Sequence, residues 1–231
     1  MTDKTPPVGP AVTTLPDGRA PEKTVLQGRW TRLEPIDPAR HADALYEAIA
    51  DAPDDLWTYM SFSPFADSSA FRAWLEPQPA VADPLAFAII DTEQGAARGM
   101  ACYMRIAPHW ATCEVGSIWY APALKRTRQA TEAMYLMAGH VFEDLGYRRY
   151  EWKCDALNAA SRSAALRLGF VYEGLFRQHV VYKGRNRDTT WYAMIDRDWP
   201  RIKAGFEAWL DPGNFDAAGI QKVGLAELRG D

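Results

Sequence analysis

Residues 114–137 read EVGSIWYAPALKRTRQATEAMYLM and combine a strand, a turn and the start of a long helix. The strand-like stretch alternates apolar positions and runs into a turn at Pro122. Lys125, Arg126 and Arg128 then stand where the helix opens. Because helix N-termini carry unpaired N–H groups and positive dipole charge, neighbouring cations favour a bound anion such as pyrophosphate. Taken alone, the same residues are equally compatible with a solvated charge run on a surface helix.

Residues 158–170 read NAASRSAALRLGF and form the second informative stretch. Asn158 precedes a short helix that carries Ser161 and Arg162 in its first turn, and Gly169 is positioned to end it. On spacing alone, Asn158 is expected to be the N-cap of that helix.

The composition of the whole chain is that of an aromatic-rich globular protein. Its 231 residues are 48% hydrophobic and 24% charged, with 9 Trp, 10 Tyr and 9 Phe, enough for one large domain or two small ones. A membrane span and a signal peptide are not predicted, so a cytoplasmic location is expected. The three cysteines, an odd and scattered number, are expected to be buried reduced thiols rather than disulfide partners or metal ligands.

Charge is distributed unevenly along the chain, whose formal net charge is −4. Residues 1–100 hold 8 basic and 15 acidic side chains, whereas residues 101–200 hold 14 basic and 10 acidic ones. A sequence pI near 5.6 disfavours a nucleic-acid partner, which needs a broad basic stripe, but the middle third can bind a small polyanion. The acidic first part favours a cationic acceptor on its side of a cleft.

Hydrophobic periodicity predicts an α/β (α+β) domain over residues 25–199, between a mobile arm (1–24) and a closing helix with a polar tail (200–231). Strands are expected at 29–34, 85–91, 99–106, 113–120, 149–154, 171–183 and 188–196, and helices at 38–52, 67–76, 127–145, 159–168 and 200–210. The turn between the last two strands is expected to place Gly184 or Asn186 at positive φ. Its basic residues could instead contact an anionic substrate group or a neighbouring subunit.

The two stretches together resemble the acetyl-CoA-binding half of the GNAT (GCN5-related) N-acetyltransferases. The resemblance is carried by IWYAPALKRTRQATEA and LGYRRYEWKCDALNAASRSAALRLGFVYEGLFR, and RWTRLEPI and AFAIID extend it to about 170 residues. It is closest in type to the RimJ/RimL branch, which includes ribosomal-protein N-terminal acetyltransferases. It implies the GNAT fold, a mixed central sheet of about seven strands covered by helices on both faces, with acetyl-CoA as cofactor and no metal.

The resemblance also implies roles for individual residues. The pantetheine arm of CoA would contact backbone groups at the end of the strand 113–120, in Ser117, Ile118, Trp119 and Tyr120. The pyrophosphate would lie on Lys125, Arg126, Thr127, Arg128, Gln129, Ala130 and Thr131. Asn158 and Arg162 would bind the cofactor, and Ser161 would protonate the departing thiolate. Ala130 and Thr131 stand where the family commonly has glycines, so basic side chains and the Thr131 hydroxyl are expected to compensate.

Two residues are candidates for the general base that takes the amine proton. Glu114 begins the strand lining the expected cleft, where this family often has a carboxylate acting through water. His179 lies on the strand expected to face the substrate, and histidine ordinarily titrates near neutral pH. Ribosomal-protein members use a Glu from about that strand, whereas Gln178, His179 and Val180 stand here. We favour Glu114.

The expected function is acetyl-CoA-dependent transfer of an acetyl group to a primary amine, in a small molecule or at a peptide or protein N-terminus. The alternative is a CoA-binding sensor or scaffold with the same fold and no turnover. A nucleoside-triphosphate enzyme is disfavoured, because the sequence has no G-x-x-x-x-G-K-[ST] run. Nucleic acid and membrane are not expected partners, whereas a homodimer is compatible with the sequence.

Overall fold

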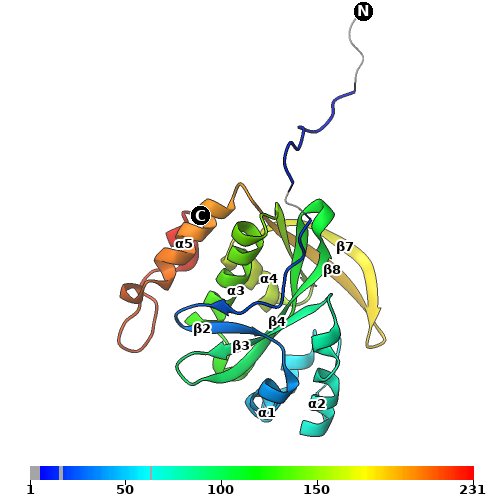
Figure 1. The fold of residues 1–231 in the computed structure, drawn as a ribbon, viewed down its shortest axis with the longest axis vertical. Coiled ribbons are helices and arrows are strands. Elements are labelled where there is room, and N and C mark those ends of the chain that lie inside the picture. Colours follow the sequence, from blue (N-terminus) through cyan, green and yellow to red (C-terminus); the bar gives the residue numbers. More distant parts are fainter. Residues whose placement is uncertain (1–5, 16–17, 63) are drawn as a thin grey trace, which may run out of the picture.

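The computed structural model describes residues 6–15, 18–62 and 64–231, which form one mixed sheet flanked by helices (Figure 1). The strands of the described chain follow the order β1-β2-β3-β4-β5-β6-β8-β7. The strands are β1 (Leu26–Gln27), β2 (Thr31–Pro35), β3 (Leu85–Asp91), β4 (Ala96–Ala107), β5 (Thr112–Tyr120), β6 (Arg149–Asp155), β7 (Val171–Tyr182) and β8 (Arg185–Ile195). The helices are α1 (Pro38–Ile49), α2 (Ser68–Leu75), α3 (Arg128–Gly139), α4 (Ala159–Leu168), α5 (Trp199–Leu210) and α6 (Leu225–Arg229).

The predicted mixed α/β sheet is confirmed, with the short β1 added at one edge. Strands β1 to β5 are antiparallel neighbours, and β5 then pairs in parallel with β6. That parallel pairing runs only from Thr112↔Arg149 to Val115↔Trp152. Residues 116–120 of β5 continue along β4 alone, so the sheet opens between β5 and β6 beyond Val115.

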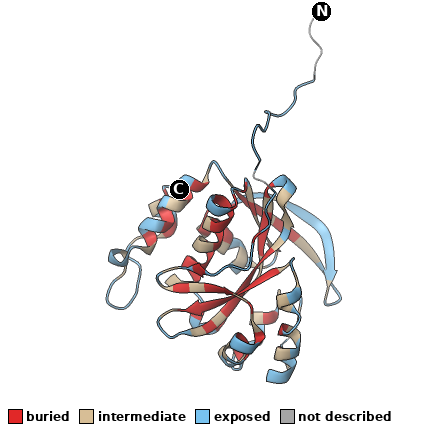
Figure 2. Cartoon of the chain, in the orientation of Figure 1, coloured by how far each residue is buried: buried red, intermediate tan, exposed pale blue. Residues whose placement is uncertain are grey.

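Two hydrophobic cores lie on the two faces of the sheet (Figure 2). The larger core packs α3, α4 and α5 against the sheet and includes Val115 and Trp152. The smaller core lies under α1 and α2 and includes Trp57, Phe71 and Trp119. Because side chains alternate along a strand, the residues next to Val115 and Trp152 lie on the face opposite α3 and α4.

Short polar side chains begin the two helices nearest the opening. Thr127 caps α3, its Oγ1 accepting the N–H of Ala130 at 3.2 Å. Asn158 caps α4, its Oδ1 accepting the N–H of Ser161 at 3.0 Å. The expected continuous helix to Leu145 is wrong in one respect, because the α-helix ends at Gly139 and a π-helical turn follows.

The C-terminal residues are not the loose polar tail that the sequence suggests. The guanidinium of Arg229 on α6 is buried and donates to the carbonyl oxygen of Arg167 at 2.7 Å and of Leu166 at 3.2 Å. These carbonyls belong to the last turn of α4, where acceptors lack intrahelical partners.

At the other end of the chain, the Tyr147 hydroxyl donates to the carbonyl of Arg19 at 2.9 Å. Residues 1–5 and 16–17 of the expected arm lie outside the described residues, and in the described chain no helix is long and apolar enough to cross a membrane.

Candidate active site

The opened part of β5 presents its backbone toward the space beside β6. Ser117 takes a left-handed conformation, with φ of 49°, at the irregularity in the β4–β5 pairing. Ile118 and Tyr120 pack against the larger core, and Trp119 lies in the smaller one. Because β5 pairs with β4 on one side only beyond Val115, the backbone groups of residues 117–120 that point away from β4 are left for a ligand lying between β5 and β6.

The N-terminus of α3 forms the second wall of the opening. Lys125 and Arg126 are exposed, and Arg126 has a φ of 63°, a left-handed conformation that the sequence achieves without glycine. The N–H groups of Arg128 and Gln129 belong to the first helical turn and have no intrahelical partner. This turn has the donor set and dipole charge of an anion site.

Other predicted members of this loop are engaged elsewhere. The Arg128 guanidinium lies 3.8 Å from the centroid of the Trp30 ring, in a cation–π contact with the N-terminal part of the sheet. Ala130 is buried. Thr131 is also buried, its Oγ1 donating to the carbonyl of Thr127 and accepting from Arg167, each at 3.2 Å. Lys125, Arg126 and the backbone donors are therefore the groups in place to meet an anion.

Ser161 lies where the opening begins. The indole N–H of Trp152, the last β6 residue paired with β5, donates to Ser161 Oγ at 3.0 Å. Because an indole N–H can only donate, it occupies one lone pair of the hydroxyl oxygen and leaves the hydroxyl proton free for another acceptor. Asn158 uses its carbonyl oxygen as the helix cap, and the exposed Arg162 lies against the carbonyl of Ala156 at 3.3 Å.

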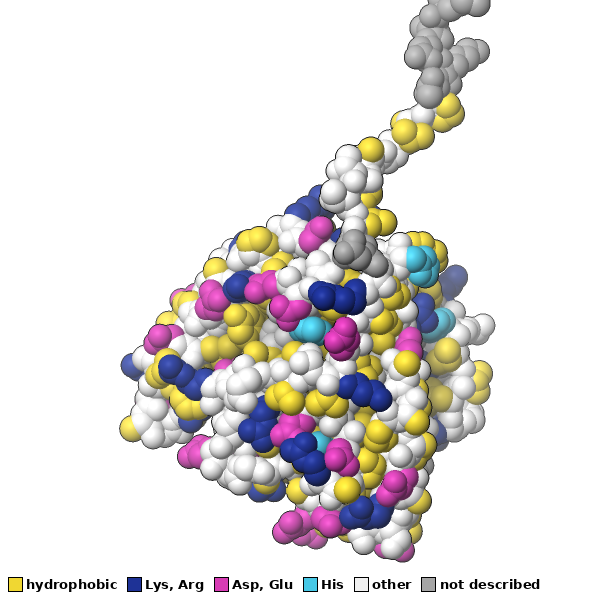
Figure 3. Space-filling model, in the orientation of Figure 1, with side chains coloured by type: hydrophobic (Ala, Val, Ile, Leu, Met, Phe, Trp, Pro, Cys, Tyr) yellow, Lys and Arg dark blue, Asp and Glu magenta, His cyan; other side chains and the backbone are white. Residues whose placement is uncertain are grey.

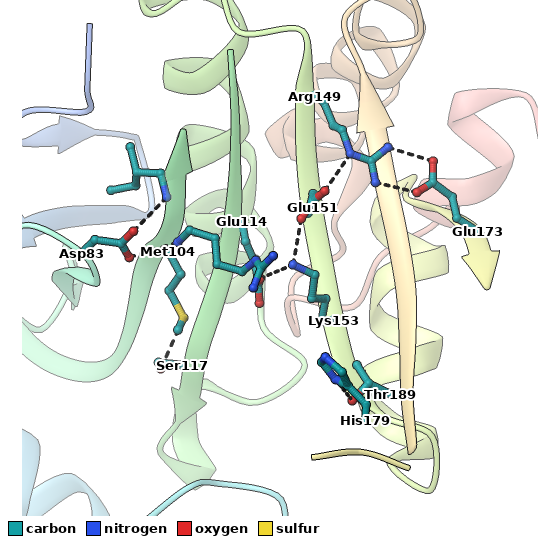
Figure 4. A network of polar contacts seen from close by, with 12 residues as sticks. Asp83, Met104, Glu114, Ser117, Arg149, Glu151, Lys153, Glu173, His179 and Thr189 are labelled. Carbon is teal, nitrogen blue, oxygen red and sulfur yellow. Dashed lines mark hydrogen bonds and ion pairs between the residues drawn. The ribbon is translucent and has the colours of Figure 1, made fainter. Parts of the chain in front are cut away.

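A buried chain of charged side chains lies on the opposite face of the same two strands (Figure 4). Lys153 Nζ is 2.7 Å from Glu114 Oε2 and 2.8 Å from Glu151 Oε2, and its side chain is only 7% exposed. The same ammonium lies 3.8 Å from the ring centroid of Trp191. Burial raises the pKa of Glu114, and the neighbouring Lys153 offsets part of that rise.

Arg105 completes this cluster from β4. Its exposed guanidinium has Nε 3.7 Å from Glu114 Oε2 and lies 5.6 Å from the Trp191 ring centroid. The backbone at Arg105 is left-handed, with φ of 50°. The Asp83 carboxylate holds it there, accepting the N–H groups of Arg105 at 3.0 Å and Ile106 at 2.9 Å. A non-glycine residue held in this conformation is typical of functional sites.

His179 lies on the same face but belongs to the exposed strand β7. Its Nδ1 is 3.0 Å from Thr189 Oγ1, and its ring packs against Phe176 and Trp191. Trp191 therefore contacts His179 on one side and Lys153, the ion-pair partner of Glu114, on the other. The predicted turn is confirmed at Gly184, whose φ is 70°, whereas Lys183 and not Asn186 takes the other left-handed position.

Sequence reasoning missed Lys153, Arg105 and Trp191. The signal for Lys153 is its place in the alternating strand RYEWKCD (β6), where Tyr150, Trp152 and Cys154 face the core and the residues between them face the other side. That alternation does not reveal that Glu114 lies beside it, because the register of β5 on β6 is a tertiary property.

The sequence from residue 31 to residue 171 matches the family model of the acetyltransferase (GNAT) domain. The chain belongs to the GNAT acetyltransferase family. A GCN5-related N-acetyltransferase from Brucella melitensis is 44% identical, with a TM-score of 0.91 over 94% of this chain and 98% of that one. A protein from Chromobacterium violaceum ATCC 12472, whose name places it in the same family, is 37% identical, with a TM-score of 0.76 over 85% of this chain and 100% of that one.

More distant GNAT structures share the fold. RimL, a ribosomal L7/L12 alpha-N-protein acetyltransferase, is 19% identical, with a TM-score of 0.66 over 74% of this chain and 94% of that one. Among curated proteins, none matches the chain. The protein is thus an acyltransferase of the GNAT family, whose members use acetyl-CoA.

The residues at the opening fit that cofactor. An anionic pyrophosphate suits the exposed Lys125 and Arg126 and the free N–H groups at the start of α3. An extended amide-containing arm suits the unpaired edge of β5 beyond Val115. Within the described residues, no group of three or more His, Cys, Asp or Glu side chains is arranged to hold a metal ion.

Proposed function

We propose that this protein is an acetyl-CoA-dependent N-acetyltransferase that acetylates a primary amine, in a small molecule or at a peptide or protein N-terminus. One observation carries the proposal. A buried carboxylate and a hydroxyl with a free proton flank the point where β5 and β6 separate, Glu114 on one face and Ser161 on the other. Amine acetylation needs both a group that accepts the amine proton and a group that donates a proton to the leaving thiolate.

Bound acetyl-CoA supplies an acetyl group activated as a thioester. Lys125, Arg126 and the N–H groups of Arg128 and Gln129 would hold its phosphates, and the backbone groups of residues 117–120 that β4 leaves unpaired would hold its pantetheine arm. Asn158 and Arg162 contribute from the start of α4. Compared with a glycine-rich loop, Ala130 and Thr131 are packed into the protein, so the anion is recognised at the N-terminal side of the turn.

Glu114 acts as the general base. An amine with an ordinary pKa of about 10 is largely protonated at neutral pH, so it has to lose a proton before it can attack. Burial raises the pKa of Glu114 toward the range in which a carboxylate is an effective base. His179 is the second candidate, and its exposure on β7 and its contact with Thr189 favour an orienting role at the rim of the site.

Ser161 donates the proton that the leaving thiolate takes up. The Trp152 indole fixes the hydroxyl oxygen at 3.0 Å, which restricts the directions open to the hydroxyl proton. A restricted hydroxyl costs less entropy to align than a free one, so this contact is a positioning device.

The acceptor is a small amine or a peptide terminus rather than a nucleic acid. On the face in Figure 3, basic side chains are interspersed with acidic ones instead of forming a continuous stripe. RimL, named for acetylation of a ribosomal protein N-terminus, supports the RimJ/RimL-type branch through its fold. This chain has Gln178, His179 and Val180 near the base position of ribosomal-protein members, which favours a different acceptor. We place the protein in the cytoplasm.

The proposal is tested by measuring free thiol released from acetyl-CoA in the presence of a panel of amines and N-terminal peptides, with mass spectrometry of the products. Thiol release that depends on the amine, and that Glu114→Gln lowers by about 10²-fold or more, supports the proposal. Tight CoA binding with slow release independent of every amine would instead indicate the sensor or scaffold alternative. Glu173→Gln, on the same face but at the outer edge, is the matched control and should keep its activity.

A further inference from the structure

Arg167, in the last turn of α4, is a half-buried cation with no role in the proposed chemistry. Its guanidinium donates to Thr131 Oγ1 at 3.2 Å and lies 5.0 Å from the centroid of the Trp209 ring. In the part of the chain that the structure describes, no carboxylate pairs with it. Burial and the neighbouring Arg229 both lower the pKa of Arg167, so the fold holds this charge in an unfavourable position.

The stability of α4 does not account for this charge. A cation in the last turn of a helix ordinarily stabilises the carbonyl groups at the helix end. Arg229 already does so, because it donates to the carbonyls of Leu166 and Arg167. The Arg229 guanidinium is in turn paired with Asp231. Arg167 is therefore a second cation at a helix end that already has one.

Aromatic side chains of the C-terminal segment place Arg167 beside the start of α3. Trp209 lies near the end of α5, which packs on the same face of the sheet as α3 (Figure 1). The ring of Phe215 lies 5.1 Å from that of Trp209, and the guanidinium of Arg128, the first residue of α3, lies 5.7 Å from the Phe215 centroid. Thr131, which accepts from Arg167, is in the first turns of the same helix. These contacts bring Arg167 to the helix end that presents free N–H groups.

Positive charge accumulates at this helix end. The helix dipole and the exposed Lys125 and Arg126 lie there together with Arg167. The acidic side chain of α3, Glu132, is engaged by the N-terminal part of the sheet, where its carboxylate accepts three backbone N–H groups of residues 29–31 at 2.7–2.9 Å. A phosphate bound among these cations would compensate their mutual repulsion.

We propose that Arg167 binds the pyrophosphate of CoA together with the N-terminus of α3, and that the C-terminal segment, residues 199–231, holds it there. This inference rests on the proposed use of acetyl-CoA. One terminal NH₂ group of the guanidinium bonds Thr131, which leaves Nε and the other NH₂ group for phosphate oxygens. The family model ends at residue 171, so Trp209 and Phe215 would support the cofactor site from outside the matched domain.

The first test is calorimetry with CoA and with dephospho-CoA, which keeps the pyrophosphate and lacks the 3′-phosphate. Arg167→Gln keeps a donor for Thr131 and removes the charge, so it should weaken the binding of both ligands equally, by about 10–100-fold. Arg167→Lys keeps the charge and should lose less affinity. Arg197→Gln, at an exposed cation just after β8, is the matched control and should bind both ligands as the wild type does.

The second test separates a binding role from a structural one by thermal unfolding with and without CoA. Free Arg167→Gln should melt at the wild-type temperature or above it, because an uncompensated charge is removed, and CoA should stabilise it less than the wild type. A lower melting temperature of the free variant, an unchanged affinity for CoA, or a loss confined to CoA and absent for dephospho-CoA would overturn this inference. A wild type that does not bind CoA would overturn the proposed function as well.

Discussion

Removing the Lys153 ammonium is expected to move the pH dependence of catalysis to higher pH. Its Nζ lies 2.7 Å from Glu114 and 2.8 Å from Glu151, in a site where the Lys153 side chain is 7% exposed. Lys153→Met keeps most of the apolar stem and removes the charge. Burial raises the pKa of Glu114 and Lys153 is the leading group that lowers it, so the substitution raises that pKa further.

The expected size of the effect follows from the distances. A single opposite charge within about 4–6 Å shifts a carboxyl pKa by about 1–3 units. The Arg105 guanidinium stays at 3.7 Å from Glu114 Oε2, but it is exposed and replaces only part of the lost charge, so the pKa of Glu114 is expected to rise. Glu114 accepts a proton only when ionised, so activity rises with pH through its pKa. The ascending limb of kcat/KM therefore moves up by the same amount, and the value at neutral pH falls about 10–100-fold.

The assay is thiol release from acetyl-CoA with the best amine over about pH 6–10, with kcat/KM fitted at each pH. Glu151→Gln should move the limb the opposite way, because the charge of Glu151 raises the pKa of Glu114. Lys153→Arg keeps the charge and should keep the limb near its wild-type position. Breaking a buried pair costs about 3–5 kcal/mol, so near-ultraviolet circular dichroism must show that each variant is folded. Limbs unmoved in folded Lys153→Met and Glu151→Gln would refute the assignment of Glu114 as base.

Three further results are expected. Replacing Lys125 and Arg126 together by Ala should weaken CoA binding about 10–100-fold by calorimetry, and more at low salt, because two exposed cations beside the start of α3 are lost. Ser161→Ala should lower kcat about 10–100-fold in steady-state kinetics and leave CoA affinity within a factor of two or so. Arg229→Met should lower the free energy of unfolding by about 3 kcal/mol in urea, because two carbonyls at the end of α4 lose a charged donor that is itself buried.

Each of these variants has a control in the chain. Arg128→Ala should lower thermal stability more than CoA affinity, since its guanidinium stacks on Trp30; an effect on CoA as large as that of the double variant would contradict our description of the turn. Ser163→Ala, exposed on the same helix, should leave kcat unchanged. An unfolding free energy for Arg229→Met equal to that of the wild type would mean that α4 does not need this donor.

Local sequence signals predicted most of the fold. The strand at Leu85–Asp91 has the predicted bounds, and Thr127, Asn158 and Gly169 begin or end helices as their chemistry requires. Residues 211–231 gave no such signal. Their fold depends on Arg229 reaching α4, about sixty residues earlier in the chain, and no local periodicity encodes that contact.

The candidate site shows the same limit more sharply. The sequence shows how many cations the turn carries. It does not show which of them are available to bind an anion, because Arg128 stacks on Trp30, which is close to it only in the folded chain. Glu114 is a candidate because the family resemblance implies a carboxylate at the start of this strand, whereas its ion pair with Lys153 requires the parallel register of β5 on β6. Residues that act through tertiary contacts are thus the ones that a single sequence leaves out.

The buried charges at Glu114, Lys153 and Glu151 are costly, which bears on their role. Well-packed apolar residues at such positions are often as stable or more stable than a buried ion pair. The cluster lies at the last residues where β5 and β6 still pair, beside the opening that suits acetyl-CoA. Arg105 is held over it by Asp83, in a left-handed conformation that also costs energy. Stability alone does not explain two unfavourable features at one point. The general base that we propose has to be both buried and fixed in position, and the Glu114 carboxylate has both properties.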